Sequence, residues 1–468
     1  MEVRKRSFVR YIILVISLLL ITSILCNQQA LNFTVICMQD VVDSQAIADP
    51  AQRHWLNDAA KKNALFSIVA VGTLIGLAPI VPAMQRIGLR NLLTLYGFMS
   101  AFATLFLPLA VDFGHTHVAI ARTLQGFSAS IVFVSVGAIT SQWSIHRQSG
   151  RYLAMLSSAG QLSSTITMPV ASAFCESSFG WRYLYYVFGT FALFLSLLFF
   201  IFYRDDPREH WLISSKEVSA IMCDKQGHSQ KETVPYKEIL TDRCMQAVLL
   251  ATFSGNIAFF IFLQFGPTYM NMALGFDISE TGYATGLAYA VSILLKFVAG
   301  PLYDITTFIP EKYRMIMFAT ISQGVVSLSF CILSQTTNKL IARIAYSGVI
   351  ACNGLNIVGV VKCAQVVARQ YIHFVIVCMT LIGCMMSFLL PVLVTIICPN
   401  NTAEEWSRLF IGLSIFVIAT NIPFLLLVED EPASWTKRTP TYKANLTQGF
   451  GTVEDGRNIL HEQKTAIN

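Results

Sequence analysis

Polar side chains inside long apolar stretches are the first feature of this sequence that could do chemistry. Arg122 lies within the apolar stretch 116–140, and Lys296 lies within another. A guanidinium stays charged at physiological pH and offers a planar fork of donors that matches a carboxylate or a phosphate. Arg122 could therefore hold an anion, or it could bond backbone carbonyls and Gln125 to stabilise helix packing, and we give both interpretations equal weight. Lys296 is four residues before Gly300, so its flexible stem is expected to reach water.

Amide side chains form the second set of candidates, because a polar group in hydrocarbon is costly unless it faces a partner or a cavity. Gln28, Gln29 and Asn32 fall near the outer end of the first apolar stretch and are expected to face a cavity. Asn353 and Asn356 are three residues apart and share a helix face, where they either join helices or line the cavity. The predicted solute-binding residues are Arg122, Gln28, Gln29, Asn32, Asn256, Gln264, Asn353 and Asn356.

Several kinds of chemistry have no signal in the sequence. The eleven cysteines lie mostly inside apolar runs, as Cys26 and Cys37 do, and are expected to be small apolar filler. No CxxC or HExxH pair, P-loop or nucleophile elbow is present, so we expect neither a metal, nor a cofactor, nor an enzyme. No Asp, Glu or His lies deep in a predicted span. The driving force therefore stays open: sodium, a proton, the membrane potential, or no gradient.

The composition is that of a multi-pass membrane protein. Hydrophobic residues make up 54% of the 468 and charged residues only 13%, with a mean hydropathy of +0.57, whereas a soluble domain has about 25% charged residues. The basic N-terminus and the apolar run after it imitate a signal peptide, but the run continues to Met38 and is long enough to be a spanning helix. The twelve predicted spans are 11–38, 64–83, 91–111, 116–140, 152–175, 183–203, 245–266, 281–299, 315–334, 341–361, 373–397 and 409–428.

Lysine and arginine placement orients these spans. With a cytoplasmic N-terminus, the segments on that side carry 24 Lys and Arg and the other side carries seven, while Arg122 and Lys296 lie within spans and complete the 33. This bias predicts that both termini are cytoplasmic. Asn400 then lies in an outside loop, in the sequence Asn400-Asn401-Thr402, and is the predicted glycosylation site. The predicted organisation is a cytoplasmic N-terminus (1–10), a six-helix bundle (11–203), a cytoplasmic linker (204–243), a second six-helix bundle (244–428) and a cytoplasmic tail (429–468).

Two motifs give the chain a family resemblance. The loop Gly300-Pro301-Leu302-Tyr303-Asp304, and Arg122-Thr-Leu-Gln-Gly126 within a span, resemble motifs of the major facilitator superfamily. The loop after the second span keeps Arg86, Gly88 and Arg90 but has Met84 and Gln85 where acidic residues are expected. The resemblance implies an all-α membrane fold of twelve helices in two six-helix halves. It also implies a conformational latch at the cytoplasmic helix ends, made by Gly300, Asp304, Arg86, Gly88 and Arg90.

Further stretches along nearly the whole chain resemble solute carrier family 17, the organic anion and phosphate transporters. They include Gln142-Trp143, Met168-Pro169, Gly180-Trp181-Arg182, Asp205-Asp206-Pro207, Pro235-Tyr236-Lys237-Glu238, Pro267-Thr268-Tyr269 and Glu404-Glu405-Trp406. Charged residues that the family carries in helices 1, 4 and 7 are replaced here by Ala30, Ala129, Gly137 and Gly255. The chain is therefore similar to a divergent member that has lost much of the family's proton and anion chemistry.

The expected function is secondary transport of a small organic solute, an anion, by alternating access between the two halves. The alternative is a non-transporting receptor or scaffold built on a transporter fold. The expected partners are the solute, a coupling ion such as sodium or a proton, and the lipid bilayer. We expect a monomer with no nucleic-acid partner, in the plasma membrane or in an intracellular vesicle or lysosomal membrane.

Overall fold

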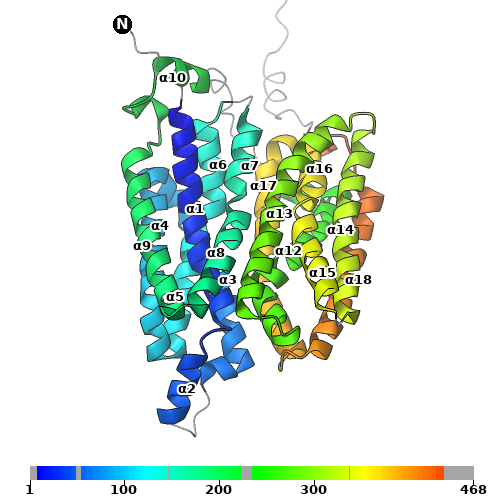
Figure 1. Cartoon of the computed structure of the whole chain (residues 1–468). Coiled ribbons are helices and arrows are strands. Elements are labelled where there is room, and N and C mark those ends of the chain that lie inside the picture. The colour runs from blue at the N-terminus through cyan, green and yellow to red at the C-terminus, as the bar shows by residue number, and fades with distance from the viewer. Residues whose placement is uncertain (1–7, 49–53, 146–147, 223–233, 337, 437–468) are drawn as a thin grey trace, which may run out of the picture.

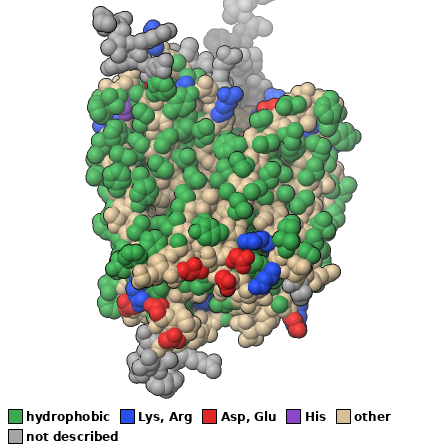
Figure 2. Space-filling view, viewed as in Figure 1, with side chains coloured by type: hydrophobic (Ala, Val, Ile, Leu, Met, Phe, Trp, Pro, Cys, Tyr) green, Lys and Arg blue, Asp and Glu red, His purple; other side chains and the backbone are tan. Residues whose placement is uncertain are grey.

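The structure is a computed structural model that describes residues 8–48, 54–145, 148–222, 234–336 and 338–436. Within these ranges every regular element is a helix, and the helices form two bundles that stand side by side (Figure 1). The predicted N-terminus before residue 8 and the predicted tail after residue 436 lie outside the described residues. Figure 2 shows that hydrophobic side chains cover most of the face in view, while charged side chains gather toward its two ends. This distribution suits a bundle whose sides contact lipid.

Each bundle contains six membrane crossings among the described residues. Two crossings of the first bundle are each built from two consecutive helices that meet at a serine. Two crossings of the second bundle include a turn of π-helix, at Tyr269–Ala273 and at Ile357–Val361. The helices of the first bundle are α1 (Val9–Thr34), α3 (Ala59–Leu77), α4 (Ile80–Phe113), α5 (His115–Ala129) with α6 (Ile131–Trp143), α7 (Ser149–Ser157) with α8 (Ala159–Glu176), and α9 (Gly180–Phe202). Those of the second bundle are α12 (Arg243–Thr268), α13 (Ile278–Ile305), α14 (Glu311–Gln335), α15 (Lys339–Asn353) with α16 (Lys362–Ala368), α17 (Ile372–Ile397) and α18 (Ala403–Leu427).

The predicted twelve-helix fold is confirmed. Ten continuous helical segments within the described residues are long and apolar enough to cross a membrane. One of them, Lys339–Ile397, is 59 residues long, which at about 1.5 Å per residue is more than twice the ~30 Å of a bilayer core, and it turns back at Arg369 to make two crossings. The broken pair α7 and α8 supplies the twelfth.

Glycines bring α3 and α5 into close contact and so position Arg122. A Cβ added to Gly126 would lie 2.1 Å from the Val69 carbonyl oxygen, and one added to Gly72 would lie 2.2 Å from the Thr123 carbonyl oxygen. Only glycine permits this approach, which is the small-residue packing typical of membrane helices. The side chain of Arg122 is thereby held against α3 rather than displaced toward lipid.

We call the end of the bundles that carries the segment 204–242 the linker end. There Gly88 breaks the helix with φ 77° and ψ 165°, and the helix restarts at Leu89. The Asp205 carboxylate accepts a hydrogen bond from the Arg90 backbone N–H at 3.1 Å and so caps the restarted helix. Burial raises the pKa of Asp205 above its ordinary value, although the amides of Arg90 and Leu89 oppose this shift.

A second carboxylate at the linker end caps another spanning helix. Glu217 belongs to the short helix α10 (Ser215–Met222), which Figure 1 shows above the first bundle. Its side chain is buried and accepts a hydrogen bond at 3.2 Å from the backbone N–H of Arg10, in the first turn of α1. The segment that follows α9 thus satisfies the free N–H groups of two helices in its own bundle.

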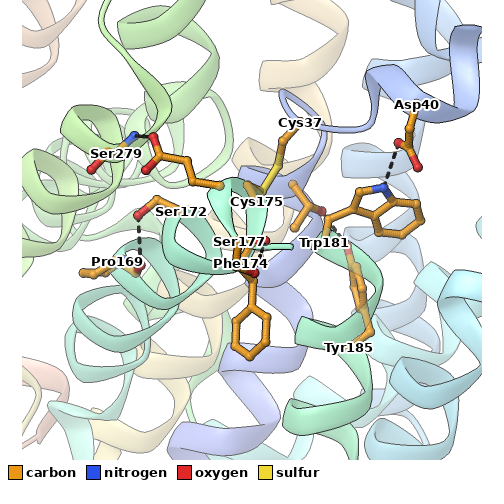
Figure 3. Close-up of a disulfide and its surroundings, with 12 residues drawn as sticks. Cys37, Asp40, Pro169, Ser172, Phe174, Cys175, Ser177, Trp181, Tyr185 and Ser279 are labelled. Carbon is orange, nitrogen blue, oxygen red and sulfur yellow. Dashed lines mark hydrogen bonds between the residues drawn. A yellow bond between two sulfur atoms is a disulfide. The ribbon is translucent and has the colours of Figure 1, made fainter. Parts of the chain in front are cut away.

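The opposite end of the first bundle carries a disulfide. Cys37, just after α1, is bonded to Cys175 in the last turn of α8 (Figure 3). The expectation that Cys37 is apolar filler was wrong, because the topology of the bundle brings together two cysteines that are 138 residues apart in sequence. Nearby, Asp40 accepts hydrogen bonds from the Trp181 indole and the Arg182 guanidinium, which hold α2 (Gln39–Ala48) against α9.

Gly88→Ala is expected to destabilise the protein by about 1–3 kcal/mol, because the backbone conformation of Gly88 is nearly exclusive to glycine. The new Cβ would also lie 2.3 Å from Oδ2 of Asp205 and would disturb the cap. The apparent Tm in detergent should fall. The control Gly412→Ala lies mid-helix with nothing within 4 Å of the added Cβ, so its Tm should stay equal or rise. Equal Tm values for the two variants would contradict this account of Gly88.

Reduction of the denatured wild-type protein should expose two thiols that a maleimide reagent cannot label beforehand, counted by mass spectrometry. In Cys37→Ser the number of labelled thiols should not increase on reduction, because Cys175 has lost its partner. Cys26→Ser, which removes a buried free thiol, should retain the increase of two. No increase in the wild-type protein would show that the bond does not form.

Candidate functional site

A small cavity lies between the two bundles, at the interface where a carrier of this plan would hold its solute. Its volume is about 20 Å³, room for little more than one water molecule. Helices α1, α3 and α5 contribute one wall, and α12 and α17 contribute the other. The lining residues are Gln28, Gln29, Asn32, Phe66, Val69, Arg122, Phe260, Leu263, Gln264 and Ser387.

Arg122 is the cation of this cavity and is only 1% exposed. Its Nη1 donates to the Gln28 carbonyl oxygen at 2.6 Å and to Oε1 of Gln125 at 2.9 Å. Nη2 donates to Oδ1 of Asn32 at 3.3 Å, and Nε donates to the Leu65 carbonyl oxygen at 3.4 Å. All four acceptors are uncharged, and no described carboxylate forms an ion pair with this guanidinium. The positive charge is solvated by the protein but not neutralised by it.

Both sequence-based interpretations of Arg122 describe part of this geometry. Its bonds to Gln125 and to backbone carbonyls are those of a packing role, whereas its place on the wall of the cavity is that of a binding role. One of the five guanidinium N–H donors, on Nη2, is not used by the four bonds. An anion in the cavity could accept a hydrogen bond from that N–H without displacing the four existing bonds.

Asn32 joins the two bundles at the cavity. Its Oδ1 accepts from Arg122 in the first bundle, and its Nδ2 donates at 3.1 Å to the Leu263 carbonyl oxygen on α12. Gln29, on the same helix, is bonded to Ser163 and Ser164 of α8 at 2.9 and 2.8 Å. The amides of helix α1 therefore connect the cavity to three neighbouring helices.

Gln264 and Ser387 are the polar residues of the second bundle that line the cavity. Gln264 donates from Nε2 to Ser387 on α17, to Oγ at 2.9 Å and to the carbonyl oxygen at 3.2 Å. Its Oε1 is buried and has no hydrogen-bond partner among the described residues.

Three of the predicted binding residues lie outside the cavity lining. Asn256 donates to the Thr252 carbonyl oxygen within its own helix at 2.9 Å. Asn353 donates to the Gly255 carbonyl oxygen at 3.1 Å, and a Cβ added to Gly255 would lie 2.5 Å from Nδ2 of Asn356. Asn353 and Asn356 thus fill the space beside Gly255, one of the positions where a charge of the family is replaced in this chain.

The predicted latch residues fall into two separate groups at the linker end. Gly88 and Arg90 meet Asp205, which belongs to the motif Asp205-Asp206-Pro207 and is not one of the predicted latch residues, and Arg86 is exposed. In the second bundle a Cβ added to Gly300 would meet nothing within 4 Å, and Asp304 is exposed. The cations there surround the neighbouring Tyr303, with the Arg314 guanidinium 4.7 Å and the Lys362 amine 6.0 Å from its ring centre.

Hydrogen bonds between the bundles are distributed unequally about the cavity. Among the described residues, four such bonds lie at the cavity or on the disulfide side of it: Asn32 to Leu263, Asn63 to Thr395, Ser67 to Phe388 and Ser279 to Glu176. On the linker side, Lys296 Nζ donates to Oγ of Ser157 at 2.9 Å, so its amine meets the other bundle rather than water alone. The bundles are thus bonded more extensively toward the disulfide end.

The Glu176 contact is a helix cap supplied by the other bundle. Its Oε1 accepts a hydrogen bond at 2.9 Å from the backbone N–H of Ser279, in the first turn of α13 (Figure 3 shows Ser279 beside the disulfide). Glu176 directly follows Cys175, so the disulfide anchors the turn that presents the carboxylate. At the same end of the molecule, the predicted glycosylation residue Asn400 is exposed, and its Nδ2 donates to Glu405.

Comparisons with known proteins agree with this architecture. A family model described as the Major Facilitator Superfamily matches residues 18–391. The chain is 24% identical to human sodium-dependent phosphate transport protein 1 over 433 residues, which cover 88% of this chain and 92% of that protein. It is 30% identical to human sialin over 221 residues, 47% of this chain and 44% of that protein. The predicted similarity to solute carrier family 17, as a divergent member, is confirmed.

Solved structures share the fold at low sequence identity. The chain superposes on a bacterial homologue of the human lysosomal transporter Spinster with a TM-score of 0.67 and 11% identity, over 90% of this chain and 97% of that one. A D-xylose–proton symporter gives the same TM-score with 14% identity, over 90% and 98%. With a matching family model over most of its length and this fold, the chain belongs to the Major Facilitator Superfamily.

Proposed function

We propose that this multi-pass membrane protein is a secondary transporter that moves a small organic anion by alternating access, with Arg122 as the anion contact. The observation that carries the proposal is the un-neutralised guanidinium on the wall of the cavity between the bundles. A buried cation without a counter-charge is costly in a low-dielectric site, so a transported anion would gain by supplying that charge. Names of relatives such as sodium-dependent phosphate transport protein 1 support an anionic solute.

The linker end is proposed to face the cytoplasm. The Lys and Arg bias supports this orientation, and so does the disulfide at the opposite end, since such bonds persist on oxidising sides of membranes. In this orientation, the bonds of Asn63, Ser67 and Glu176 to the second bundle hold the two bundles together on the outer side. Opening outward requires these bonds to break, and opening inward requires Lys296 to leave Ser157.

The transport cycle follows from the size of the cavity. Because it holds little more than a water molecule, a solute can enter only when the bundles separate on one side. Asn32 contacts both Arg122 and α12, so an anion at Arg122 would alter the bond that joins the bundles. Among the described residues Glu217 is the only buried carboxylate, and it lies at the linker end, away from the cavity. This supports coupling of transport to sodium or to the membrane potential over coupling to a proton carried by a buried acid.

Arg122→Gln is expected to abolish uptake of an anionic solute into proteoliposomes, because it removes the charge while keeping a side chain that can still bond Gln28 and Asn32. Arg122→Lys should retain part of the uptake with a raised KM, since a point charge replaces the fork. The control Arg151→Gln changes an exposed arginine away from the cavity and should transport normally.

The assay should screen organic anions and phosphate under imposed sodium, proton and electrical gradients in turn. Unchanged uptake by Arg122→Gln would contradict the assignment of this residue. A purified protein that binds an anion but never moves it across a sealed bilayer would instead favour the receptor or scaffold alternative.

A further inference from the structure

The orientation of the Gln264 amide is fixed by its neighbours. A backbone carbonyl can only accept hydrogen bonds, so the amide group that faces the Ser387 carbonyl oxygen must be the –NH₂. The reverse orientation would place two carbonyl oxygens against each other. Oε1 is therefore the atom left without a partner, and the residue that carries it lines the cavity and is 5% exposed.

An unpartnered acceptor in such a place points to a ligand. Buried polar groups in folded proteins are almost always hydrogen-bonded, and an exception requires a reason. Many other described residues, such as Thr268 and Gln323, also carry buried atoms without a partner, but among them Gln264 is the one that lines the cavity. Gln264 combines the free acceptor with a position opposite the only cation that lines this cavity.

We infer that Gln264 determines substrate specificity: its Oε1 accepts a hydrogen bond from a hydroxyl or amino group of the transported anion. The inference rests on the proposed function, because it assumes that an anion occupies Arg122. It narrows the substrate class to small organic anions that carry a hydrogen-bond donor, such as hydroxy acids and amino acids.

The placement of the two polar groups supports this class of solute. Arg122 is on α5 of the first bundle and Gln264 is on α12 of the second. Asn32 bonds both Arg122 and the carbonyl oxygen of Leu263, the residue before Gln264. A solute with an anionic group at one end and a donor at the other would thus bond both bundles at once. Phe66 and Phe260 also line the cavity, one from each bundle, and would contact the carbon atoms between these groups.

A hydrogen bond between the solute and Gln264 would also favour closure of the bundles over the solute. A carboxylate without a hydroxyl or amino group could bind Arg122, but it would leave Oε1 of Gln264 buried and unpaired when the bundles close. Since an unpaired buried acceptor carries the full desolvation cost, closure over such a solute is disfavoured. Selection then occurs at the closing step and should appear in the transport rate as well as in binding.

The experiment compares solute pairs that differ only in hydroxyl groups: lactate with propanoate and 3-hydroxybutanoate with butanoate, which differ by one, and gluconate with hexanoate, which differ by five. Uptake into proteoliposomes is measured for the wild-type protein, Gln264→Met, and the matched control Gln323→Met, a buried glutamine of α14 away from the cavity. We expect the wild-type protein and Gln323→Met to prefer the hydroxylated member of at least one pair by on the order of tenfold. Gln264→Met should lose that preference and still transport.

The outcomes separate the two proposals. Equal uptake of both members of every pair by the wild-type protein, unchanged by Gln264→Met, would overturn the role of Gln264 and leave anion transport intact. Such a result would mean that Oε1 of Gln264 accepts a hydrogen bond from water and not from the solute. Uptake of inorganic phosphate in preference to every organic acid would likewise overturn this substrate class while sparing Arg122. Uptake of no anion would overturn the proposed function and this inference with it. If Gln264→Met does not fold, Gln264→Glu, which keeps an acceptor but adds a negative charge, should reduce uptake of all anions while keeping the preference for the hydroxylated members. Uptake equal to that of the wild-type protein would overturn the role of Gln264.

Discussion

A guanidinium buried inside a membrane bundle is the constraint on which the rest of this architecture depends. Its charge cannot reach bulk water, so the protein must surround it with acceptors. These come from the Gln28 and Leu65 carbonyls and the Gln125 and Asn32 side chains, on helices α1, α3 and α5. The three helices must therefore converge, and the glycine contacts between α3 and α5 let them do so. Asn32 then carries the same network to the second bundle, so the charge is solvated by contacts that the transport cycle can change.

Carboxylates cap helices at both ends of the molecule, but in two physically different ways. At the linker end, Asp205 and Glu217 cap helices of their own bundle, and Glu217 is buried. These bonds need not break when the bundles move against each other. At the disulfide end, Glu176 caps a helix of the other bundle and is exposed, so water can replace the helix N–H at small cost. Of the two linker-end caps, Glu217 is thus buried and Asp205 partly buried, whereas the cap between the bundles is exposed.

The sequence predicts the fold better than it predicts the contacts. Twelve apolar stretches are visible because each spanning helix needs about twenty apolar residues, whatever its neighbours are. Five of the eight predicted binding residues, Arg122, Gln28, Gln29, Asn32 and Gln264, line one cavity, because polar groups in spans tend to face inward. Asn353 and Asn356 also face the interior of the protein, but they pack against Gly255 and not against the cavity. The periodicity of a helix predicts that an amide faces inward, but it does not predict which neighbour the amide contacts. The pairing of Asp205 with Gly88 and of Cys37 with Cys175 depends on which helices are neighbours, and that information is not local in the sequence.

The Cys37–Cys175 bond also has a consequence for biogenesis. It joins the first crossing to the fifth, so it cannot close until 138 further residues have been made after Cys37. At about 5–20 residues per second, that interval is roughly 7 to 28 s. During it, α1 stays in the membrane as an amide-rich helix whose partners Arg122, Ser163 and Ser164 are only then being synthesised. The bond can therefore form only after the fifth of the six crossings of the first bundle has been made. Once it has formed, the helix that carries Gln28, Gln29 and Asn32 can no longer separate from α8.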